Sequence, residues 1–486
     1  MKFEPTEDSL SRHAIPDWYH DAKFGIFIHW GLYSVPAFAP PGNQTMAEMQ
    51  AEQGLEFLKT TPYAEWYLNS MKFKDYPTWQ YHVKTYGEDY AYENFQESFE
   101  RESAGMDPAE WGELFSEAGA RYVVMVTKHH DGYLLWPSEH RNPLKPDYYS
   151  KRDLVGEATE AVRAKGLKMG FYYSGVFDWT FIDEPLCDAF SSMRNYAQGR
   201  QYSDYARSHF LELITKYKPS ILWNDIGAPY DLDVREIQAF FYNHVADGVT
   251  NDRWLQLNLP EDPEELAALK AELTSGGMGH ADVFRGLRKS KFHHDFSTPE
   301  YQTYDEIRER KWEAARGIGR SFGYNRIETE EDMLTSTQLI HMLVDIVSKN
   351  GNLLLNVGPM ASGAIPEMQQ TPLRDLGQWL RANGAAIYGT RPWLRAEGST
   401  GDGLDVRYSL NGDRLYATVL GRPRTGDLIL TGLRARENTK ITLLAQKHTL
   451  AWENLDKDIK IGFPSIPMDT PACSLVISPV PRDTAP

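Results

Sequence analysis

The sequence predicts an α/β protein in which a TIM-like (β/α) barrel is followed by a C-terminal antiparallel β-sandwich. Three observations predict this fold class. Short apolar runs alternate with helical patterns, which is typical of a parallel sheet. The chain of 486 residues has room for a barrel and a smaller domain. Helical periodicity then ends near residue 400, where short strand-like runs take over.

The expected barrel strands are apolar runs bounded by turn residues. They lie at Phe24–Ile28, Tyr122–Val126, Leu167–Tyr173, Ile221–Trp223 and Leu353–Val357. Such short, wholly apolar runs are typical of buried strands. The helical patterns between them lie at Ala109–Ala118, Val155–Ala164, Asp204–Tyr217, Ser336–Ser348 and Pro372–Asn383. The last pattern ends at Gly384, a residue that commonly terminates helices.

The sequence pattern changes after Arg391-Pro392-Trp393, from alternating helical and strand-like segments to short strand-like runs alone. Asn411-Gly412 beyond it is typical of a hairpin turn. The strand-like runs are Val406–Leu410, Arg414–Leu420, Leu428–Leu430, Lys440–Leu444 and Leu475–Ile477. We therefore expect a barrel domain over residues 1–395 and a β-sandwich domain over residues 396–486. Glu261–Ser290 is charged, then glycine-rich, then basic, and is expected to be a surface insertion.

Composition excludes several classes of partner. The net charge of −17 argues against nucleic acid and anionic membranes, which both require a basic face.

Two cysteines are too few for a disulfide framework. No apolar run approaches the roughly 18 residues of a membrane-spanning helix. The first residues also lack the apolar stretch of a signal peptide, which predicts a cytoplasmic protein, although a trimmed secretory or periplasmic form would look the same.

Polar residues directly follow the predicted strands. They are His29-Trp30, Lys128-His129-His130-Asp131, Tyr172-Tyr173, Asp225 and Asn356. In a (β/α) barrel the C-terminal strand ends face one pocket, so residues far apart in sequence converge there. A single histidine at such a position is commonly just a hydrogen-bonded core residue. The repetition at five strand ends indicates an active site.

The chemistry of these strand-end residues allows more than one interpretation. Asp225 leaves an apolar strand beside Trp223 and is a candidate nucleophile or base, unless it only caps a helix. His129-His130-Asp131 and the later His293-His294-Asp295 could bind a metal. Adjacent histidines on an extended segment point to opposite faces, however, so they seldom share one ion. Neutral histidines among aromatic rings instead fit a sugar, with its apolar CH faces and its hydroxyls.

A sugar-cleaving site generally needs two carboxyl groups. Glu300, Glu313 and Glu65 are each flanked by aromatic residues, in Pro299-Glu300-Tyr301, Trp312-Glu313 and Glu65-Trp66-Tyr67. Most glutamates of such a chain are solvated surface groups. Residue type and neighbours do not rank these three.

The motifs together resemble the α-L-fucosidases of glycoside hydrolase family 29, from about Trp18 to Trp393. The matching pieces are Lys23-Phe24-Gly25-Ile26-Phe27-Ile28-His29-Trp30-Gly31, Glu65-Trp66-Tyr67, Lys128-His129-His130-Asp131-Gly132, Tyr172-Tyr173-Ser174, Trp223-Asn224-Asp225, Asn251-Asp252-Arg253-Trp254, Thr298-Pro299-Glu300-Tyr301, Lys311-Trp312-Glu313, Ser321-Phe322-Gly323-Tyr324-Asn325 and Asn352-Leu353-Leu354-Leu355-Asn356-Val357-Gly358-Pro359.

The resemblance implies a retaining, exo-acting α-L-fucosidase that works by double displacement on fucosylated glycans or oligosaccharides, without a metal or cofactor. It implies Asp225 as the nucleophile and Glu300 as the acid/base, with Arg253 beside Glu300. The residues that it implies around the fucose are His29, Glu65, Trp66, His129, His130, Tyr172, Trp223 and Phe322. Tyr172 is preferred to Tyr173 by spacing alone.

Two departures from the family pattern affect these expectations. Residues 255–294 intervene between the Arg253 and Glu300 motifs, and such an insertion could form a lid or an interface. A homo-oligomer stays possible. It also leaves Glu313, or a residue of the insertion, open as the acid/base. Ile226 follows Asp225 where glycine is commoner. Two other functions stay open: a metal-dependent barrel hydrolase and a catalytically silent fucose-binding protein.

Overall fold

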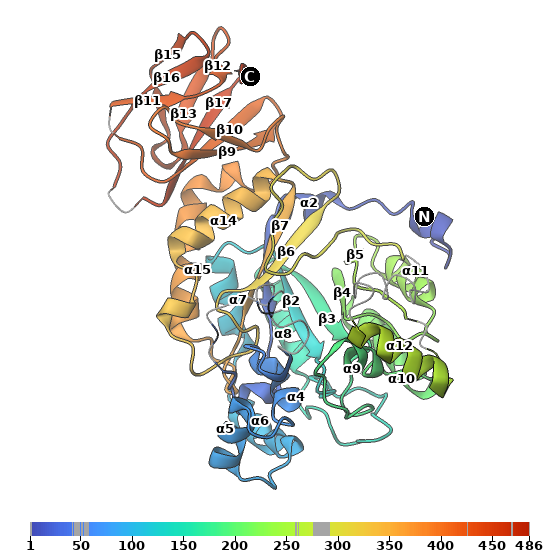
Figure 1. Ribbon diagram of the computed structural model, residues 1–486. Helices are drawn as coiled ribbons and strands as arrows, with labels where there is room; N and C mark the ends of the chain where they lie inside the picture. Colours follow the sequence, from blue (N-terminus) through green and yellow to red (C-terminus); the bar gives the residue numbers. More distant parts are fainter. Residues whose placement is uncertain are drawn as a thin grey trace.

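The computed structural model describes residues 2–40, 42, 49, 52, 58–257, 260, 262–275, 292–424, 426–467 and 470–485. Its larger part is a curled parallel sheet surrounded by helices (Figure 1). Seven strands form this sheet in the order β5-β4-β3-β2-β1-β7-β6. They are β1 (Phe24–Ile28), β2 (Tyr122–Lys128), β3 (Lys168–Ser174), β4 (Ile221–Asp225), β5 (Val249–Thr250), β6 (Trp312–Gly317) and β7 (Gly351–Val357). The predicted fold class is confirmed.

The segment 296–300 lies between the two edge strands of this sheet. It makes isolated parallel bridges on both sides: Asn251–Phe296, Ser297–Trp312 and Glu300–Ala315. The segment therefore occupies the place of an eighth strand and connects β5 to β6. This position brings Glu300 to the same end of the barrel as the C-terminal ends of the strands.

Helices cover the outside of the sheet. Those that follow or precede barrel strands are α7 (Pro108–Glu117), α8 (Leu154–Ala164), α10 (Arg200–Tyr217), α11 (Val234–His244), α14 (Ser336–Ser348) and α15 (Glu367–Asn383). Further helices in the described residues are α1 (Glu7–Leu10), α2 (Asp17–Ala22), α4 (Tyr67–Ser70), α5 (Pro77–Tyr86), α6 (Phe95–Ser103), α9 (Ala189–Arg194) and α12 (Pro263–Ser275). Apolar side chains of the outer helices pack on the sheet, as Leu213 of α10 and Leu343 of α14 do in the main core.

The predicted elements appear within a few residues of their expected bounds. Two strands of the barrel sheet were missed. β5 is only two residues long, and β6 contains Glu313 and Arg316, so neither reads as an apolar run. The helix α12 lies within the expected insertion, and the rest of that stretch lies mostly outside the described residues.

The C-terminal part is antiparallel. Its larger sheet has the order β14-β13-β17-β10-β9-β8, and a three-stranded sheet has the order β11-β16-β15. The first contains β8 (Glu397–Ser399), β9 (Asp405–Asn411), β10 (Arg414–Leu420), β13 (Lys440–Leu443), β14 (His448–Leu450) and β17 (Ala472–Ser478). The second contains β11 (Gly426–Leu430), β15 (Trp452–Leu455) and β16 (Asp458–Phe463), and β12 (Leu433–Arg434) pairs with β18 (Arg482–Asp483). The sequence patterns did not predict β8, β12, β14, β15, β16 and β18 of this C-terminal part. The two larger sheets share one apolar core, as a β-sandwich requires.

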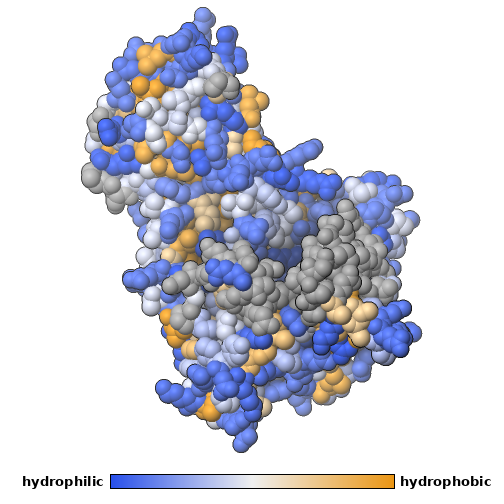
Figure 2. Space-filling view, in the orientation of Figure 1, coloured by the Kyte–Doolittle hydropathy of each residue, from blue (hydrophilic) through white to orange (hydrophobic). Residues whose placement is uncertain are grey.

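The C-terminal sandwich rests on α14 and α15 of the barrel (Figure 1). His341 contacts the carbonyl oxygen of Pro471 through Nε2 at 2.7 Å, and Trp379 donates to the carbonyl oxygen of Ala472 at 2.9 Å. Hydrophilic residues dominate the visible surface of both parts (Figure 2). Among the described helices, none is both long enough and apolar enough to cross a membrane.

Candidate active site

A pocket opens at the C-terminal ends of the barrel strands. All eleven site residues expected from the sequence line it: His29, Glu65, Trp66, His129, His130, Tyr172, Trp223, Asp225, Arg253, Glu300 and Phe322. Phe27, Tyr63, Ile226 and Ala315 complete the lining. Six of the eleven come from strand ends or the residues that directly follow them, which is where a (β/α) barrel gathers its functional groups.

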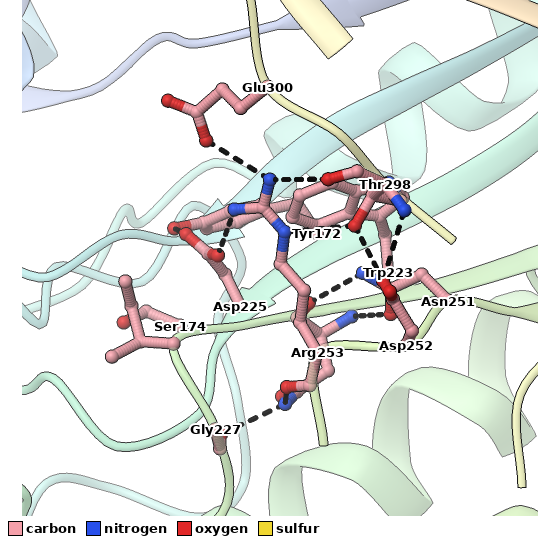
Figure 3. Close-up of polar contacts among 12 residues, drawn as sticks. Tyr172, Ser174, Trp223, Asp225, Gly227, Asn251, Asp252, Arg253, Thr298 and Glu300 are labelled. Carbon is pink, nitrogen blue, oxygen red and sulfur yellow. Dashed lines mark hydrogen bonds and ion pairs between the residues drawn. The ribbon is translucent and has the colours of Figure 1, made fainter. Parts of the chain in front are cut away.

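Asp225 is the last residue of β4 and is buried. Its Oδ1 accepts a hydrogen bond from Nη1 of Arg253, and its Oδ2 accepts one from the hydroxyl of Tyr172, both at 2.8 Å (Figure 3). Burial by itself raises the pKa of Asp225, but the positive charge of Arg253 and the hydrogen bonds outweigh it, so this pKa lies below its ordinary value. The carboxylate is therefore held ionised although it is buried.

Arg253 joins Asp225 to Glu300. Its Nη1 contacts Asp225, and its Nη2 lies 3.0 Å from Oε2 of Glu300. Glu300 also accepts a hydrogen bond from the hydroxyl of Tyr63 at 3.1 Å. One planar guanidinium thus contacts both carboxylates, one through each of its terminal nitrogens (Figure 3).

The guanidinium itself is held by the segment that carries Glu300. Nε of Arg253 donates to Oγ1 of Thr298 at 3.0 Å. Oδ1 of Asp252 in turn accepts hydrogen bonds from the backbone N–H and the hydroxyl of Thr298. These contacts connect the Arg253 loop to the Glu300 segment despite the 40 or so residues between them.

His29 presents a hydrogen-bond acceptor to the pocket. The amide of Asn356 donates to the carbonyl oxygen of Phe322, so its Oδ1 must accept from Nδ1 of His29, at 2.6 Å. The proton of the neutral imidazole then sits on Nδ1, which leaves a lone pair on Nε2. Burial lowers the pKa of His29 to about 4, so the ring is neutral at ordinary pH.

His130 is oriented in the same way. The hydroxyl of Ser174 donates to the carbonyl oxygen of Phe177 and therefore accepts from Nδ1 of His130, at 2.7 Å. Burial lowers the pKa of His130 to about 3 and holds the pKa of His129 well below its ordinary value. Nδ1 of His129 is buried without a hydrogen-bond partner among the described residues.

The other two glutamates take different places. Glu65 lines the pocket, and its Oε2 accepts a hydrogen bond from the backbone N–H of Gly323 at 2.7 Å. Burial raises the pKa of Glu65 to about 8. Glu313 does not line the pocket: it is fully buried in the barrel, where it accepts from the indole N–H of Trp223 and from the hydroxyls of Tyr19 and Tyr122.

Several strand-end residues point away from the pocket. Lys128 pairs with Asp178 at 2.8 Å in the interior. Asp131 accepts hydrogen bonds from Tyr92 and from the backbone of Tyr133, so its carboxylate does not converge with the adjacent histidines. The three ligands of a catalytic metal site are thus not assembled by His129-His130-Asp131.

The backbone after Asp225 is unusual. Ile226 adopts φ of 65°, a left-handed conformation that costs a β-branched residue roughly 1–2 kcal/mol. Gly227, which follows, has φ of 139°. The side chain of Asn224 binds the carbonyl oxygens of Gly227 and Arg253, and its backbone N–H donates to Asn251. This network holds the turn after Asp225 in place, with Ile226 at the position where glycine was expected to be commoner.

Sequence reasoning missed Phe27, Tyr63, Ile226 and Ala315. Phe27 lies on β1 two residues before His29, so strand alternation could have placed it on the same side. Tyr63 and Ala315 carried no local signal. They reach the pocket only through the tertiary fold.

Two carboxyl groups beside one pocket are the arrangement with which glycosidases cleave sugars. Fold and site therefore define a glycoside hydrolase built on a (β/α) barrel. The family model for Alpha-L-fucosidase matches residues 1–385, and the model for the Alpha-L-fucosidase C-terminal domain matches residues 403–477. The chain belongs to the α-L-fucosidase family.

Individual relatives agree with this assignment. The α-L-fucosidase of Dictyostelium discoideum is 32% identical over 97% of this chain and 94% of its own length. The human tissue α-L-fucosidase is 30% identical over 96% of this chain and 89% of its own length. The crystal structure of the Thermotoga maritima α-fucosidase in complex with fucose is 38% identical, with a TM-score of 0.81, and covers 98% of this chain and 100% of that one.

Proposed function

We propose that this α-L-fucosidase cleaves terminal α-L-fucosyl groups by a double displacement in which Asp225 is the nucleophile and Glu300 the acid/base. One observation carries the assignment: Arg253 contacts both carboxylates at once, at 2.8 Å and 3.0 Å. Retaining glycosidases place their two carboxyl groups about 5–5.5 Å apart, and a shared guanidinium holds two acids at close range.

In the first step, Asp225 attacks the anomeric carbon while Glu300 protonates the departing oxygen. Glu300 gives its proton to the departing oxygen in this step and is left as a carboxylate. In the second step that carboxylate takes a proton from the water molecule that attacks the fucosyl-enzyme, which restores the acid.

The histidines and aromatic rings account for sugar recognition. The free Nε2 lone pairs of His29 and His130 can each accept a hydrogen bond from a sugar hydroxyl. Phe322, Trp66 and Trp223 provide apolar surface for the CH groups and the methyl group of fucose. The Thermotoga maritima relative was solved both with fucose and with a mechanism-based inhibitor, which supports a fucosyl substrate for this pocket.

The nucleophile is tested with Asp225→Ala. Turnover of an aryl α-L-fucoside should be lost while the protein stays folded. Added azide should restore part of it and yield β-fucosyl azide, because the anion attacks directly from the face that Asp225 has vacated. Near-normal turnover by a folded Asp225→Ala protein would refute the assignment.

The acid/base is tested with Glu300→Ala and with Glu313→Gln as a matched control. General acid catalysis contributes about 10²–10⁴-fold, and this contribution matters most when the leaving oxygen is basic. Glu300→Ala should therefore lose most of its activity on a fucosyl disaccharide and much less in the fucosylation step with a nitrophenyl fucoside. Azide should now yield α-fucosyl azide, since it attacks the fucosyl-enzyme in place of water.

Glu313→Gln should slow both substrates alike, because Glu313 only holds Trp223 and its neighbours. A uniform loss in Glu300→Ala together with a leaving-group dependence in Glu313→Gln would exchange the two roles. If neither variant showed that dependence, Glu65 would be the next residue to test.

A further inference from the structure

A second cluster of ionisable side chains lies outside the catalytic pocket. His13 follows α1 near the N-terminus, while His293 and Asp295 lead into the segment 296–300. One ligand atom from each of these three residues lies within 4.8 Å of the other two. Their side chains are 4%, 9% and 1% exposed, respectively. None of the three lines the catalytic pocket.

The distances within the cluster suit a small metal ion. Nδ1 of His13 lies 2.8 Å from Oδ1 of Asp295, and Nε2 of His293 lies 3.5 Å from the same oxygen. Metal–ligand bonds of about 2.0–2.1 Å in a tetrahedral zinc site place neighbouring ligand atoms about 3.3 Å apart. The two observed separations bracket that value. The ligand atoms of the two histidines lie within 4.8 Å of each other.

One ligand atom has no other role in the structure. Nε2 of His293 is buried and has no hydrogen-bond partner among the described residues. A buried imidazole nitrogen that is not hydrogen-bonded is costly, and a bound cation would satisfy it. At 3.5 Å the contact with Asp295 is too long to count as a good hydrogen bond.

The carboxylate of the cluster is already oriented. Oδ2 of Asp295 accepts hydrogen bonds from the hydroxyl of Tyr242 at 2.9 Å and from the backbone N–H of Thr250 at 2.8 Å. Oδ1 is thereby directed at the two histidines. Outer contacts of this kind commonly orient the ligands of metal sites. The ring of His13 stacks on Tyr242 with centroids 3.8 Å apart, which fixes that ring as well.

We propose that His13, His293 and Asp295 bind one divalent transition-metal ion, with zinc as the favoured occupant and a water molecule in the fourth position. Two imidazole nitrogens and one carboxylate oxygen are a donor set that zinc uses readily. Coordination by Nδ1 of His13 needs the proton of that neutral ring on Nε2.

The site is structural rather than catalytic. A metal here joins the N-terminal segment to the start of the segment 296–300, which bears Glu300 and contacts both β5 and β6. Because the ion binds the folded chain and not the unfolded one, it stabilises the fold. Hydrolysis itself does not require it.

The test uses the full chain, stripped with EDTA and then dialysed against zinc. Wild type should retain about one zinc ion per chain by elemental analysis, and His13→Gln and His293→Gln should each lose it. His294→Gln is the matched control, because His294 belongs to the same segment but not to the cluster. Saturating zinc should raise the thermal midpoint by a few degrees in wild type and in His294→Gln only. In the absence of zinc, all three variants should turn over an aryl fucoside as fast as wild type. This activity also shows that the variants are folded.

Zinc held by the catalytic histidines would inhibit turnover and would persist in the His13 and His293 variants, so it is distinguished from the proposed site. Cobalt-loaded wild type gives a check that needs no variant: a four-coordinate nitrogen and oxygen site should show intense visible absorption. Equal zinc content in wild type and in folded His293→Gln would overturn the proposal. So would a cobalt-loaded wild type without that absorption.

Discussion

Glu65 should keep its proton at neutral pH. Comparing the pH dependence of unfolding between wild type and Glu65→Gln tests this. The carboxyl is buried beside the pocket, and burial raises its pKa from 4.5 to about 8. In the unfolded chain the same group titrates near its ordinary value. Between these two pKa values the folded state holds one proton more than the unfolded state. The free energy of unfolding must therefore fall as pH rises through this window.

The size of the effect follows from the shift. Each pKa unit corresponds to 1.36 kcal/mol, so the rise from 4.5 to about 8 removes about 5 kcal/mol of stability across the window. Glutamine has the shape of a protonated glutamate and does not titrate. Its amide oxygen can accept the hydrogen bond from the backbone of Gly323 that Glu65 now accepts. The variant should thus lack this component of the pH dependence.

The assay is urea unfolding of wild type and Glu65→Gln at intervals from pH 5 to pH 9. The quantity to follow is the difference between their unfolding free energies, because other titrating groups contribute equally to both proteins and cancel. Wild type should lose stability relative to the variant up to about pH 8, and the difference should then level off. Parallel curves would show that Glu65 is ionised at neutral pH and would refute the reasoning.

Three further predictions concern residues of the proposed fucose site. Arg253→Met should move the acidic limb of the kcat/KM profile to higher pH, because Arg253 lowers the pKa of Asp225; an unmoved limb would contradict this. Ser174→Ala should reduce kcat/KM about tenfold, since loss of one hydrogen bond to His130 costs about 1–1.5 kcal/mol, and Ser174→Thr should recover part of it if the hydroxyl is what matters. His29→Ala should raise the free energy of the transition state by about 2–4 kcal/mol, the size of effect seen when one hydrogen-bonding group of an active site is removed. Steady-state kinetics on an aryl fucoside measure this loss, and a loss below twofold would contradict a role of His29 in sugar binding.

Much of the site was predictable because each buried strand of a barrel can be recognised from a short stretch of sequence. A run such as Phe24–Ile28 identifies a buried strand without reference to the rest of the chain, and the polar residue after it must lie at the strand's C-terminal end. The barrel then brings these ends together. His29, His129 and Asp225 therefore meet in one pocket, although they are up to about 200 residues apart.

What the sequence determined by itself was the fold class, the strand-end residues and, through its motifs, the family. What only the tertiary structure decided was how otherwise equivalent residues are used. Glu300, Glu65 and Glu313 all have aromatic neighbours in sequence. In the structure, however, Glu300 contacts Arg253, Glu65 is buried at the wall of the pocket, and Glu313 is fully buried inside the barrel. Burial and hydrogen bonding distinguish the three carboxyl groups. Both depend on contacts between distant segments, and no local pattern encodes them.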